Sequence, residues 1–439
     1  MLRSQTSKWS TIIATSILFL ATAGALLCVG GCQEWIPYHL VMGRIGVVTS
    51  SLSMIALVGT FVAFLLRHGT AKGGLKYCWR HYVMLRMIRV ELLGAGIYVE
   101  QFDGQEKVAV LPRIKISFSN DLLTGTVKIQ RQLKTERRLE SMDISCALGS
   151  YIVEQSYISG NGNFYVYDIF DASYDRQLKF QSCEEYIGAM QKADDYALIV
   201  DAVTTIPLHH SIICGQTGSG KSYFLNALIV QMLNKKVRYN LYFADPKRSG
   251  LSVVGSLVAT ERTADTVDDI IEMLRSFHAA LKLRMDEMKV FLSESVRVDR
   301  NYNDFGLEPS VLIFDEYLAF SLALSNYKKD VRDEVASILS DVVLMGRQCG
   351  FYIWLVMQSA PATQIPTFIR DQMVWKVVLG NSDRSTYTVT FDSSADIPTG
   401  KFSIGYGVYT FAGITEKPKI LAAPTIRDFD IVKTLSTAM

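Results

Sequence analysis

The segment with the clearest chemical content is a glycine-rich loop that ends in lysine and serine. Gly215, Gly220, Lys221 and Ser222 fit the pattern G-x-x-x-x-G-K-[ST]. In such a loop the backbone N–H groups hold phosphates, the lysine reaches the β- and γ-phosphates, and the serine hydroxyl binds Mg²⁺. The predicted ATP-binding residues are Gly215, Gln216, Thr217, Gly218, Ser219, Gly220, Lys221 and Ser222, with Lys221 also catalytic.

Two acidic residues further along the chain are expected to complete this site. Asp315 and Glu316 directly follow the apolar run 311–314. An acid at the carboxyl end of a buried strand lies where open α/β sheets bind ligands. We expect Asp315 to bind Mg²⁺ and Glu316 to polarise the attacking water. Together with the loop, the pair predicts ATP hydrolysis rather than nucleotide binding alone.

The segments around these residues predict alternating strands and helices. An apolar strand precedes the loop, and residues 222–233 have the apolar spacing of a helix. Other strands are expected to end at Asp245 and at Gln358. A long helix between them carries the apolar stripe Val267, Ile270, Ile271, Leu274, Phe277, Leu281, Met285 and Met288. This alternation predicts an α/β fold with a parallel sheet that is covered on both faces.

The order of the motifs resembles the FtsK/SpoIIIE family of membrane-anchored DNA translocases. The resemblance covers roughly residues 206–415 and rests on "GQTGSGKS", "DPK", "IFDE", "GRQCGFYIWLVMQ" and "NSDRST". It implies a RecA-like P-loop motor that forms a ring, usually of six subunits, around duplex DNA. It also implies that Gln358 senses the γ-phosphate and that Arg384 reaches the nucleotide of the next subunit. Arg347 and Arg370 are alternatives to Arg384, and each arginine could instead form a structural ion pair.

The sequence departs from this family in two places. Members usually have an Arg-Pro pair soon after the glutamine, whereas "QSAPATQ" stands at residues 358–364, so a DNA contact there is not carried over. We also expect no winged-helix module after the motor. A membrane anchor, a small linking domain and one motor resemble more closely the coupling ATPases of Gram-positive conjugative elements, the TcpA-like group. That resemblance implies delivery of DNA to a membrane channel, with a relaxase or relaxosome and channel proteins as partners.

Two uncharged runs near the N-terminus predict a transmembrane hairpin. Residues 12–31 and 45–66 are each long enough to cross a bilayer. Trp35, Pro37 and Tyr38 lie between them, as is common at a membrane interface. A cleaved signal peptide is the alternative interpretation of the first run.

Basic residues outside the two runs predict the orientation of this hairpin. They are Arg3 and Lys8 before the first run, and Arg67, Lys72, Lys76, Arg80, Arg86 and Arg89 after the second. Because basic residues stay on the cytoplasmic side, we expect both termini in the cytoplasm and the protein in the cell membrane. The basic stretch after the second run could serve only this purpose, or it could also lie on anionic lipid.

The chain is expected to divide into three parts. Residues 1–90 form the membrane anchor, 91–205 a small mixed α/β linking domain without a catalytic signature, and 206–439 the motor. In the linking domain Arg131, Lys134 and Arg138 have helical spacing. They could contact a phosphate backbone or form a solvated helix face.

Composition excludes several kinds of protein. Lys and Arg number 45 against 43 Asp and Glu, so any DNA-binding patch must be local. The seven cysteines include no C-x-x-C pair, which argues against a disulfide framework or a zinc site. His209 and His210 have no third ligand in view and are expected to be structural. Other functions left open are protein export, chromosome or plasmid segregation, and a docking platform without ATPase activity.

Overall fold

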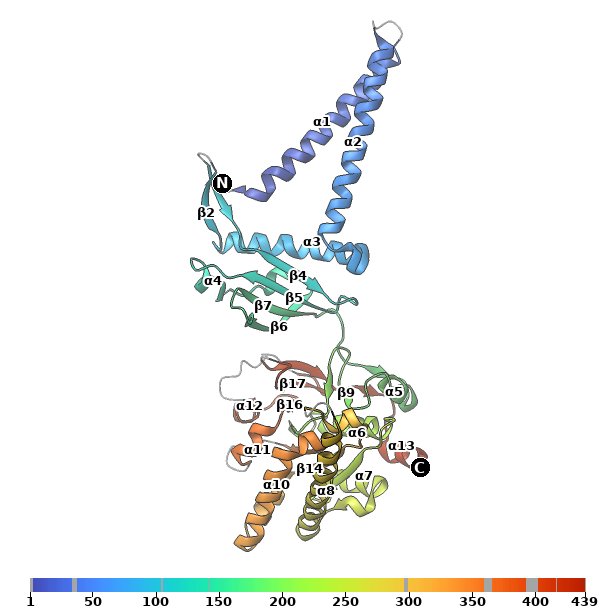
Figure 1. Cartoon of the computed structure of the whole chain (residues 1–439), viewed down its shortest axis with the longest axis vertical. Helices are drawn as coiled ribbons and strands as arrows, with labels where there is room; N and C mark the ends of the chain where they lie inside the picture. The colour runs from blue at the N-terminus through green and yellow to red at the C-terminus, as the bar shows by residue number, and fades with distance from the viewer. Residues whose placement is uncertain are drawn as a thin grey trace. The chain divides into compact units, whose positions relative to one another are not determined.

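The computed structural model describes most of the chain. The described residues are 3–33, 38–103, 106–140, 142–295, 299–358, 365–391, 402–415 and 417–438. They form two compact units, Met1–Tyr174 and Asp175–Met439 (Figure 1). The first unit contains the N-terminal helices and a small β domain, and the second contains a large α/β sheet.

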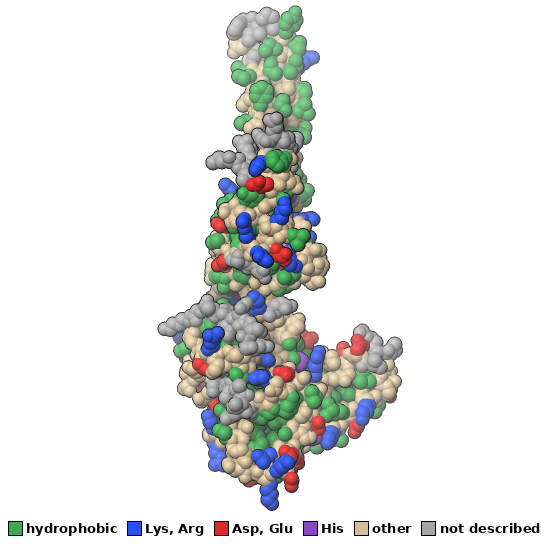
Figure 2. All heavy atoms as spheres, turned by 90° about the vertical axis from the view of Figure 1, so that its left-hand side faces the viewer, with side chains coloured by type: hydrophobic (Ala, Val, Ile, Leu, Met, Phe, Trp, Pro, Cys, Tyr) green, Lys and Arg blue, Asp and Glu red, His purple; other side chains and the backbone are tan. Residues whose placement is uncertain are grey.

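Helices α1 (Gln5–Gly31) and α2 (His39–Arg67) pack against each other in the first unit. The contact is close because two glycines lie in it. A Cβ atom on Gly24 would be 2.6 Å from Ser50 Oγ, and one on Gly46 would be 2.5 Å from Cys28 N. Hydrophobic side chains gather on the surface of this hairpin (Figure 2). Small residues at such a contact are typical of helices that pack in membranes.

The predicted membrane spans are supported to different degrees. Leu40–Arg67 is long and apolar enough to cross a membrane, with a mean hydropathy of 2.0, and it includes the predicted run 45–66. The apolar part of α1 among the described residues, Thr15–Val29, is shorter than the length expected of a span. A single candidate span is therefore found in the described part of the chain. Trp35 and Pro37 lie outside the described residues.

Helix α3 (Thr70–Gly94) follows α2 and lies on a four-stranded antiparallel sheet. The sheet has the order β4 (Ile114–Phe118), β5 (Thr124–Gln130), β7 (Phe164–Asp171) and β6 (Tyr151–Ile158). Met84, Ile88 and Leu92 of α3 are buried in its core. A second, smaller sheet consists of β1 (Arg3–Ser4), β3 (Glu106–Val110) and β2 (Val99–Asp103).

The predicted helical spacing in the linking domain is wrong. Helix α4 covers only Glu136–Glu140, so Arg131 and Lys134 precede it and share no helix face with Arg138. Arg131 follows the end of β5 and forms an ion pair with Glu136 instead. The local pattern failed because β5 continues to Gln130 and a turn follows it, in which Thr135 N donates to Gln132 O at 2.9 Å, before α4 begins.

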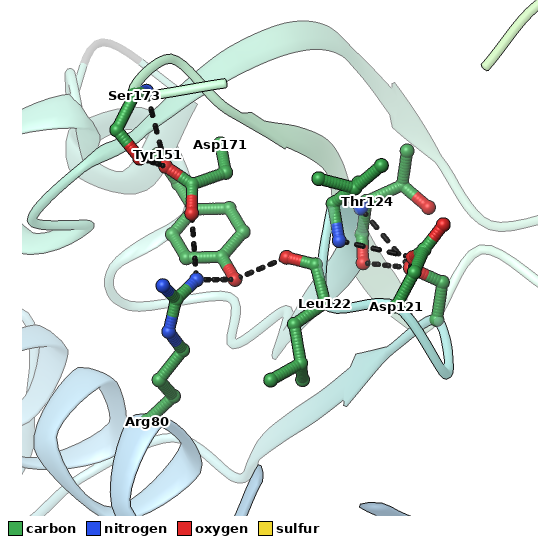
Figure 3. Close-up of polar contacts among 9 residues, drawn as sticks. Arg80, Asp121, Leu122, Thr124, Tyr151, Asp171 and Ser173 are labelled. Carbon is green, nitrogen blue, oxygen red and sulfur yellow. Dashed lines mark hydrogen bonds and ion pairs between the residues drawn. The ribbon is translucent and has the colours of Figure 1, made fainter. Parts of the chain in front are cut away.

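Arg80 joins α3 to the ends of two strands (Figure 3). Its Nη1 atom donates hydrogen bonds to Tyr151 Oη and to Asp171 Oδ2, both at 2.6 Å. The Tyr151 hydroxyl in turn donates to the Leu122 carbonyl at 2.6 Å, in the turn between β4 and β5. Ser173 donates to the other oxygen of Asp171 from its N–H and its hydroxyl, at 3.1 and 2.6 Å. This network fixes the position of α3 on the sheet.

The second unit is built on an eight-stranded sheet. Its order is β13 (Thr263–Ala264), β12 (Asn240–Ala244), β14 (Ser310–Asp315), β15 (Phe351–Met357), β11 (Ser211–Gly215), β16 (Trp375–Leu379), β17 (Tyr406–Phe411) and β18 (Lys419–Ala422). The strands from β13 to β16 are parallel, as predicted, but β17 and β18 are antiparallel, so the sheet is mixed. The direction reverses because β17 begins beside the end of β16, where Gly380 N donates to Tyr406 O at 2.7 Å.

Helices cover the sheet and bury its central strands completely. They are α6 (Lys221–Leu233), α7 (Gly250–Val258), α8 (Val267–Glu294), α9 (Tyr317–Leu324), α10 (Lys329–Cys349), α11 (Thr367–Gln372), α12 (Arg384–Phe391) and α13 (Ile431–Ala438). The apolar stripe predicted for α8 faces the core, where Ile270, Leu274 and Phe277 are fully buried. Burial on both faces explains the uninterrupted apolar sequences of β14 and β15.

Residues 175–205 pack with the second unit. They include α5 (Cys183–Met190), the strand pairs formed by β8 (Lys179–Phe180) with β19 (Thr425–Ile426) and by β9 (Ala197–Ile199) with β10 (Thr205–Pro207). Tyr186 donates its hydroxyl to the Ala227 carbonyl at 2.8 Å, and Gln231 bonds both backbone groups of Ile199. Along the chain, the first compact unit therefore ends at Tyr174. The boundary expected from the sequence between linking domain and motor was at residue 205.

The ion pair of Arg80 predicts a pH-dependent stability of the first unit. Burial alone would raise the pKa of Asp171, but hydrogen bonds from Ser173, Arg80 and Ser150 lower this pKa to about 2. Because the folded pKa is below that of an unfolded aspartate, the stabilisation is present above about pH 4 and is lost as the pH falls toward about 2.

Replacing Arg80 by methionine should destabilise the β-sheet of the first unit by about 1–3 kcal/mol at neutral pH. The measurement is hydrogen exchange of the β7 amides in the full-length chain, which should become faster. The difference from the wild type should shrink between about pH 4 and pH 2. The matched control is Arg86→Met on the exposed side of the same helix. Equal exchange rates at neutral pH in Arg80→Met and the wild type would contradict the role of the network.

Candidate active site

The glycine-rich loop connects the buried strand β11 to helix α6, which begins at Lys221. Gly218 and Gly220 have φ angles of 84° and 93°, in the left-handed region that favours glycine. Gly405 N donates a hydrogen bond to Ser219 O at 2.9 Å and supports the loop from behind. A Cβ atom on Gly220 would be 3.1 Å from the same nitrogen. The loop thus exposes its free N–H groups and the N-terminus of α6 on one side.

The loop forms one wall of a cleft of about 370 Å³. The cleft is lined by Gly215, Gln216, Thr217, Gly218, Gly220, Lys221, Ser222, Tyr223, Lys247, Ser249, Asp315, Glu316 and Gln358. Of the predicted nucleotide-binding residues, Ser219 alone does not line it, because its side chain is buried behind the loop. The structure therefore brings together residues that are far apart in the sequence and that were assigned to one site.

The order of the strands explains how these residues meet. Strand β15 lies between β11 and β14 and is parallel to both. The carboxyl ends of parallel strands meet at one edge of a sheet. Gln358, the first residue after β15, therefore stands between Lys221 and Asp315. A phosphate held by the loop would lie within this group of side chains.

Two lysines surround the acidic pair. Lys221 Nζ is 3.7 Å from Asp315 Oδ1 and 3.6 Å from Glu316 Oε1. Lys247 Nζ is 3.1 Å from Glu316 Oε2. Burial raises the pKa of Asp315, while the charge of Lys221 opposes this increase. The Glu316 carboxylate is thus held between two ammonium groups.

The backbone of Glu316 is strained. Its φ and ψ angles are 49° and 47°, which is the left-handed conformation and is uncommon for a residue with a Cβ atom. The residue caps β14 and starts α9, and its N–H donates to Val356 O at 2.8 Å. Strained residues persist where the surroundings hold them and are concentrated at active sites. The conformation turns the Glu316 side chain into the cleft beside Lys221.

Asp245 organises the loop that carries Lys247. It is fully buried and accepts hydrogen bonds from the N–H groups of Lys247, Ser249 and Ser252 at 3.2, 2.7 and 3.0 Å. The Ser249 hydroxyl lies 2.8 Å from Asp245 Oδ2 and 3.3 Å from Asp315 Oδ2. The Ser249 hydroxyl therefore connects Asp245, the first residue of the "DPK" segment, to Asp315 of the acidic pair.

Sequence analysis missed Ser249 and Tyr223 and gave Lys247 no defined contact. The available signal for the turn after β12 was Asp245 at the strand end, with Ser249 four residues later. Nothing in the local sequence indicated that Lys247 would reach Glu316, because that contact joins the ends of two neighbouring strands, β12 and β14.

The three candidate arginines lie outside this cleft. Arg384 is exposed at the first residue of α12, Arg347 is exposed on α10, and Arg370 is half-buried on α11. None of them lines the cleft of its own chain. Residues 359–364, where the family has its Arg-Pro pair, lie outside the described residues.

His210 has a structural environment. Its Nδ1 atom accepts a hydrogen bond from Ile353 N at 3.1 Å, and burial lowers the pKa of its ring to about 3. The neutral ring packs against Tyr352, with the ring centroids 5.4 Å apart. The neighbouring His209 accepts a hydrogen bond from Trp354 Nε1 at its carbonyl. Both residues thus help to hold β11 beside β15.

Comparison with known proteins confirms the resemblance that the motifs predicted. Residues 187–373 match the FtsK/SpoIIIE family. The Ftsk domain-containing protein YdcQ of Bacillus subtilis (strain 168) is 24% identical over 347 residues, which is 78% of this chain and 68% of that protein. The DNA translocase FtsK of Clostridium acetobutylicum is 25% identical over 210 residues, 45% of this chain and 26% of that protein. This chain therefore aligns with only about a quarter of that translocase.

Solved structures that match this chain include that of the pCW3 conjugation coupling protein TcpA in its monomer form with ATPγS. It is 14% identical, with a TM-score of 0.47, and the alignment covers 81% of this chain and 99% of that one. Another is EssC (ATPases 2 and 3) from Geobacillus thermodenitrificans, which is 12% identical with a TM-score of 0.43. That alignment covers 60% of this chain and 50% of EssC.

Removing the Lys247 ammonium group, which lies beside Glu316, should impair ATP hydrolysis more than nucleotide binding. In Lys247→Met, Glu316 keeps only Lys221 beside it, so its carboxylate is held less firmly in the orientation that faces the attacking water. We expect kcat for ATP hydrolysis to fall by roughly ten-fold or more, with nucleotide affinity changed by less than about two-fold. Arg248→Met is the matched control, because Arg248 is adjacent and exposed and pairs with Asp265 at 3.5 Å. Equal losses in both variants would contradict a specific role of Lys247.

Proposed function

We propose that this chain, in which residues 187–373 form a P-loop ATPase domain of the FtsK/SpoIIIE type, is a membrane-anchored translocase that moves DNA with the energy of ATP hydrolysis. The observation that carries the proposal is the cleft that unites Lys221, Glu316 and Gln358 within the segment matching this family. A nucleotide-binding protein without hydrolysis would not require the acidic pair, or Gln358 at the end of the strand between the loop and that pair.

The predicted site residues of the cleft have the following tasks in the proposed reaction. The loop N–H groups and Lys221 hold the β- and γ-phosphates, and Glu316 polarises the attacking water. Ser222 and Asp315 supply the hydroxyl and carboxylate oxygens that suit Mg²⁺, which keeps its other positions for water and phosphate. Mg²⁺ would neutralise charge on the phosphates. Gln358 lies where it can contact the γ-phosphate and report its loss.

The anchor is proposed to be a hairpin with both termini in the cytoplasm. The candidate span in α2 supports one crossing. Because α1 packs along α2 through Gly24 and Gly46, we propose that α1 crosses the membrane as well. The basic residues from Arg67 to Arg89 favour a cytoplasmic position for everything that follows.

The proposed cargo is DNA delivered to a membrane channel during conjugation. The motifs of the motor, its single copy and its membrane anchor support this role. With a net charge of only +2, the chain would contact the DNA backbone through local basic groups, without reading the bases. A homo-hexamer around the DNA, a relaxase or relaxosome and channel proteins are the proposed partners.

The first test is ATP hydrolysis by the full-length chain in lipid nanodiscs, with and without single- and double-stranded DNA. We expect DNA to stimulate hydrolysis, and Lys221→Ala to reduce it by roughly 100-fold or more because the phosphates lose their cation. Glu316→Gln should bind ATP but not hydrolyse it. Hydrolysis that depends on Lys221 but ignores DNA would favour a protein cargo, and no hydrolysis by assembled protein would favour a docking platform.

The second test asks whether Arg384 acts on the next subunit. Arg384→Ala should lower kcat by roughly 10³-fold or more if its charge stabilises the transition state in trans. Mixing Arg384→Ala with Lys221→Ala chains should restore part of the activity, because some interfaces then combine an intact loop with an intact arginine. Arg347→Ala and Arg370→Ala are the matched controls. Restoration by one of these variants instead would assign the role to that residue.

A further inference from the structure

Helix α3 has a second apolar face, which does not contact the sheet. Its residues follow one another at intervals of three or four, so they lie on one side of the helix. They are Leu75, Trp79, Val83, Met87 and Val90, with exposed fractions of 67, 66, 38, 42 and 57%. The opposite side, which includes Tyr77 and Ile88, is almost completely buried in the core of the first unit.

The rotation of α3 about its axis is fixed, so this exposure is a property of the fold. Arg80 bonds to Tyr151 and Asp171 at the sheet (Figure 3). Tyr77 Oη accepts a hydrogen bond from Phe118 N at 3.3 Å, at the end of β4. With these two contacts made, Trp79 must point away from the sheet.

The same face is basic. Lys76 and Arg86 are both exposed on it, and among the described residues neither forms an ion pair with a carboxylate. The sequence contains no acidic residue between the end of α2 and Glu91. A helix surface that combines large apolar side chains, a tryptophan and basic residues is typical of helices that lie at a membrane interface.

The position of α3 in the chain supports the same partner. The part of α3 that carries this face begins at Leu75, after a kink at Gly73 and Gly74, and residues 68–74 separate it from the candidate span that ends at Arg67. The His68 ring packs against Tyr82, with centroids 5.4 Å apart, and its Nδ1 atom lies 2.9 Å from that of His81. Within the first unit, Figure 1 shows α2 leaving α3 on the side opposite the four-stranded sheet. The exposed face therefore begins close to the point where a span ending at Arg67 would leave the bilayer, after a kink that lets the helix change direction.

We propose that α3 lies on the membrane surface, with Leu75, Trp79 and Val83 at the boundary of headgroups and acyl chains. Lys76 and Arg86 contact anionic headgroups. The inference rests on the proposed membrane anchoring by α2. The helix then binds lipid on one face and the four-stranded sheet on the other, and it holds the small β domain of the first unit against the membrane.

The test uses the full-length chain at one copy per nanodisc. The lipids are phosphatidylcholine and phosphatidylglycerol, with or without bromine on the upper acyl chain, which quenches nearby tryptophan fluorescence. The difference between the wild type and Trp79→Phe isolates Trp79 from the other tryptophans. We expect brominated lipid to reduce the fluorescence of Trp79 to about half or less. Interfacial helices bury their apolar face about 5–10 Å into the boundary of headgroups and acyl chains, which is near the bromine on the upper acyl chain. Aqueous iodide should quench it weakly.

A second variant tests the basic residues. Lys76→Gln with Arg86→Gln should weaken the quenching of Trp79 by brominated lipid when phosphatidylglycerol is present, and should remove the difference between discs with and without that lipid. The matched control is Lys128→Gln, an exposed lysine on β5. An equal effect of this control would overturn the assignment of the two basic residues to headgroups.

Other results would overturn the proposal. If brominated lipid leaves the Trp79 component unchanged while iodide quenches it, the face is not in lipid. If Trp79 becomes shielded only when several copies share one disc, a second copy covers the face. Vesicle flotation and resistance to alkaline carbonate report insertion of the chain separately, so loss of anchoring is distinguished from loss of the α3 contact. Neither readout involves ATP or DNA.

Discussion

The active site depends on the parallel pairing of β15 with β11 and β14. This arrangement places three strand ends side by side, and each contributes a different chemical group: phosphate-binding N–H groups and Lys221, the amide of Gln358, and the acidic pair. A strand inserted between the other two also sets the width of the cleft, because each strand adds about 4.8 Å. A change in strand order would separate the acids from the phosphates.

Charge compensation determines the details within this cleft. Asp315 and Glu316 are adjacent carboxylates, and Asp245 lies close behind them in a buried position. Lys221 and Lys247 balance the pair, while Asp245 is satisfied by backbone N–H groups and by Ser249. Acids in such surroundings are costly unless each has a partner. The ion pairs around Glu316 connect the phosphate loop to the "DPK" loop, so a ligand at Lys221 would alter the contacts of Lys247.

In the first unit, the two sides of helix α3 have different roles. The buried side of α3 supplies the core of the small β domain through Met84, Ile88 and Leu92. Its other side is apolar and basic at once and follows the candidate membrane span after a kink at Gly73 and Gly74. Arg80 separates these two roles, because its bonds to Tyr151 and Asp171 hold one face on the sheet and leave the other outside.

The sequence by itself determined the phosphate loop, the acidic pair, the α/β alternation and the apolar run of α2, because each depends on neighbouring residues. The tertiary structure alone decided that β17 and β18 run antiparallel, that Arg131 pairs with Glu136 outside a long helix, and that Lys247 contacts Glu316. It also decided which face of α3 stays exposed. These features arise from pairing between segments distant in the chain, and local spacing carries no information about which strands become neighbours.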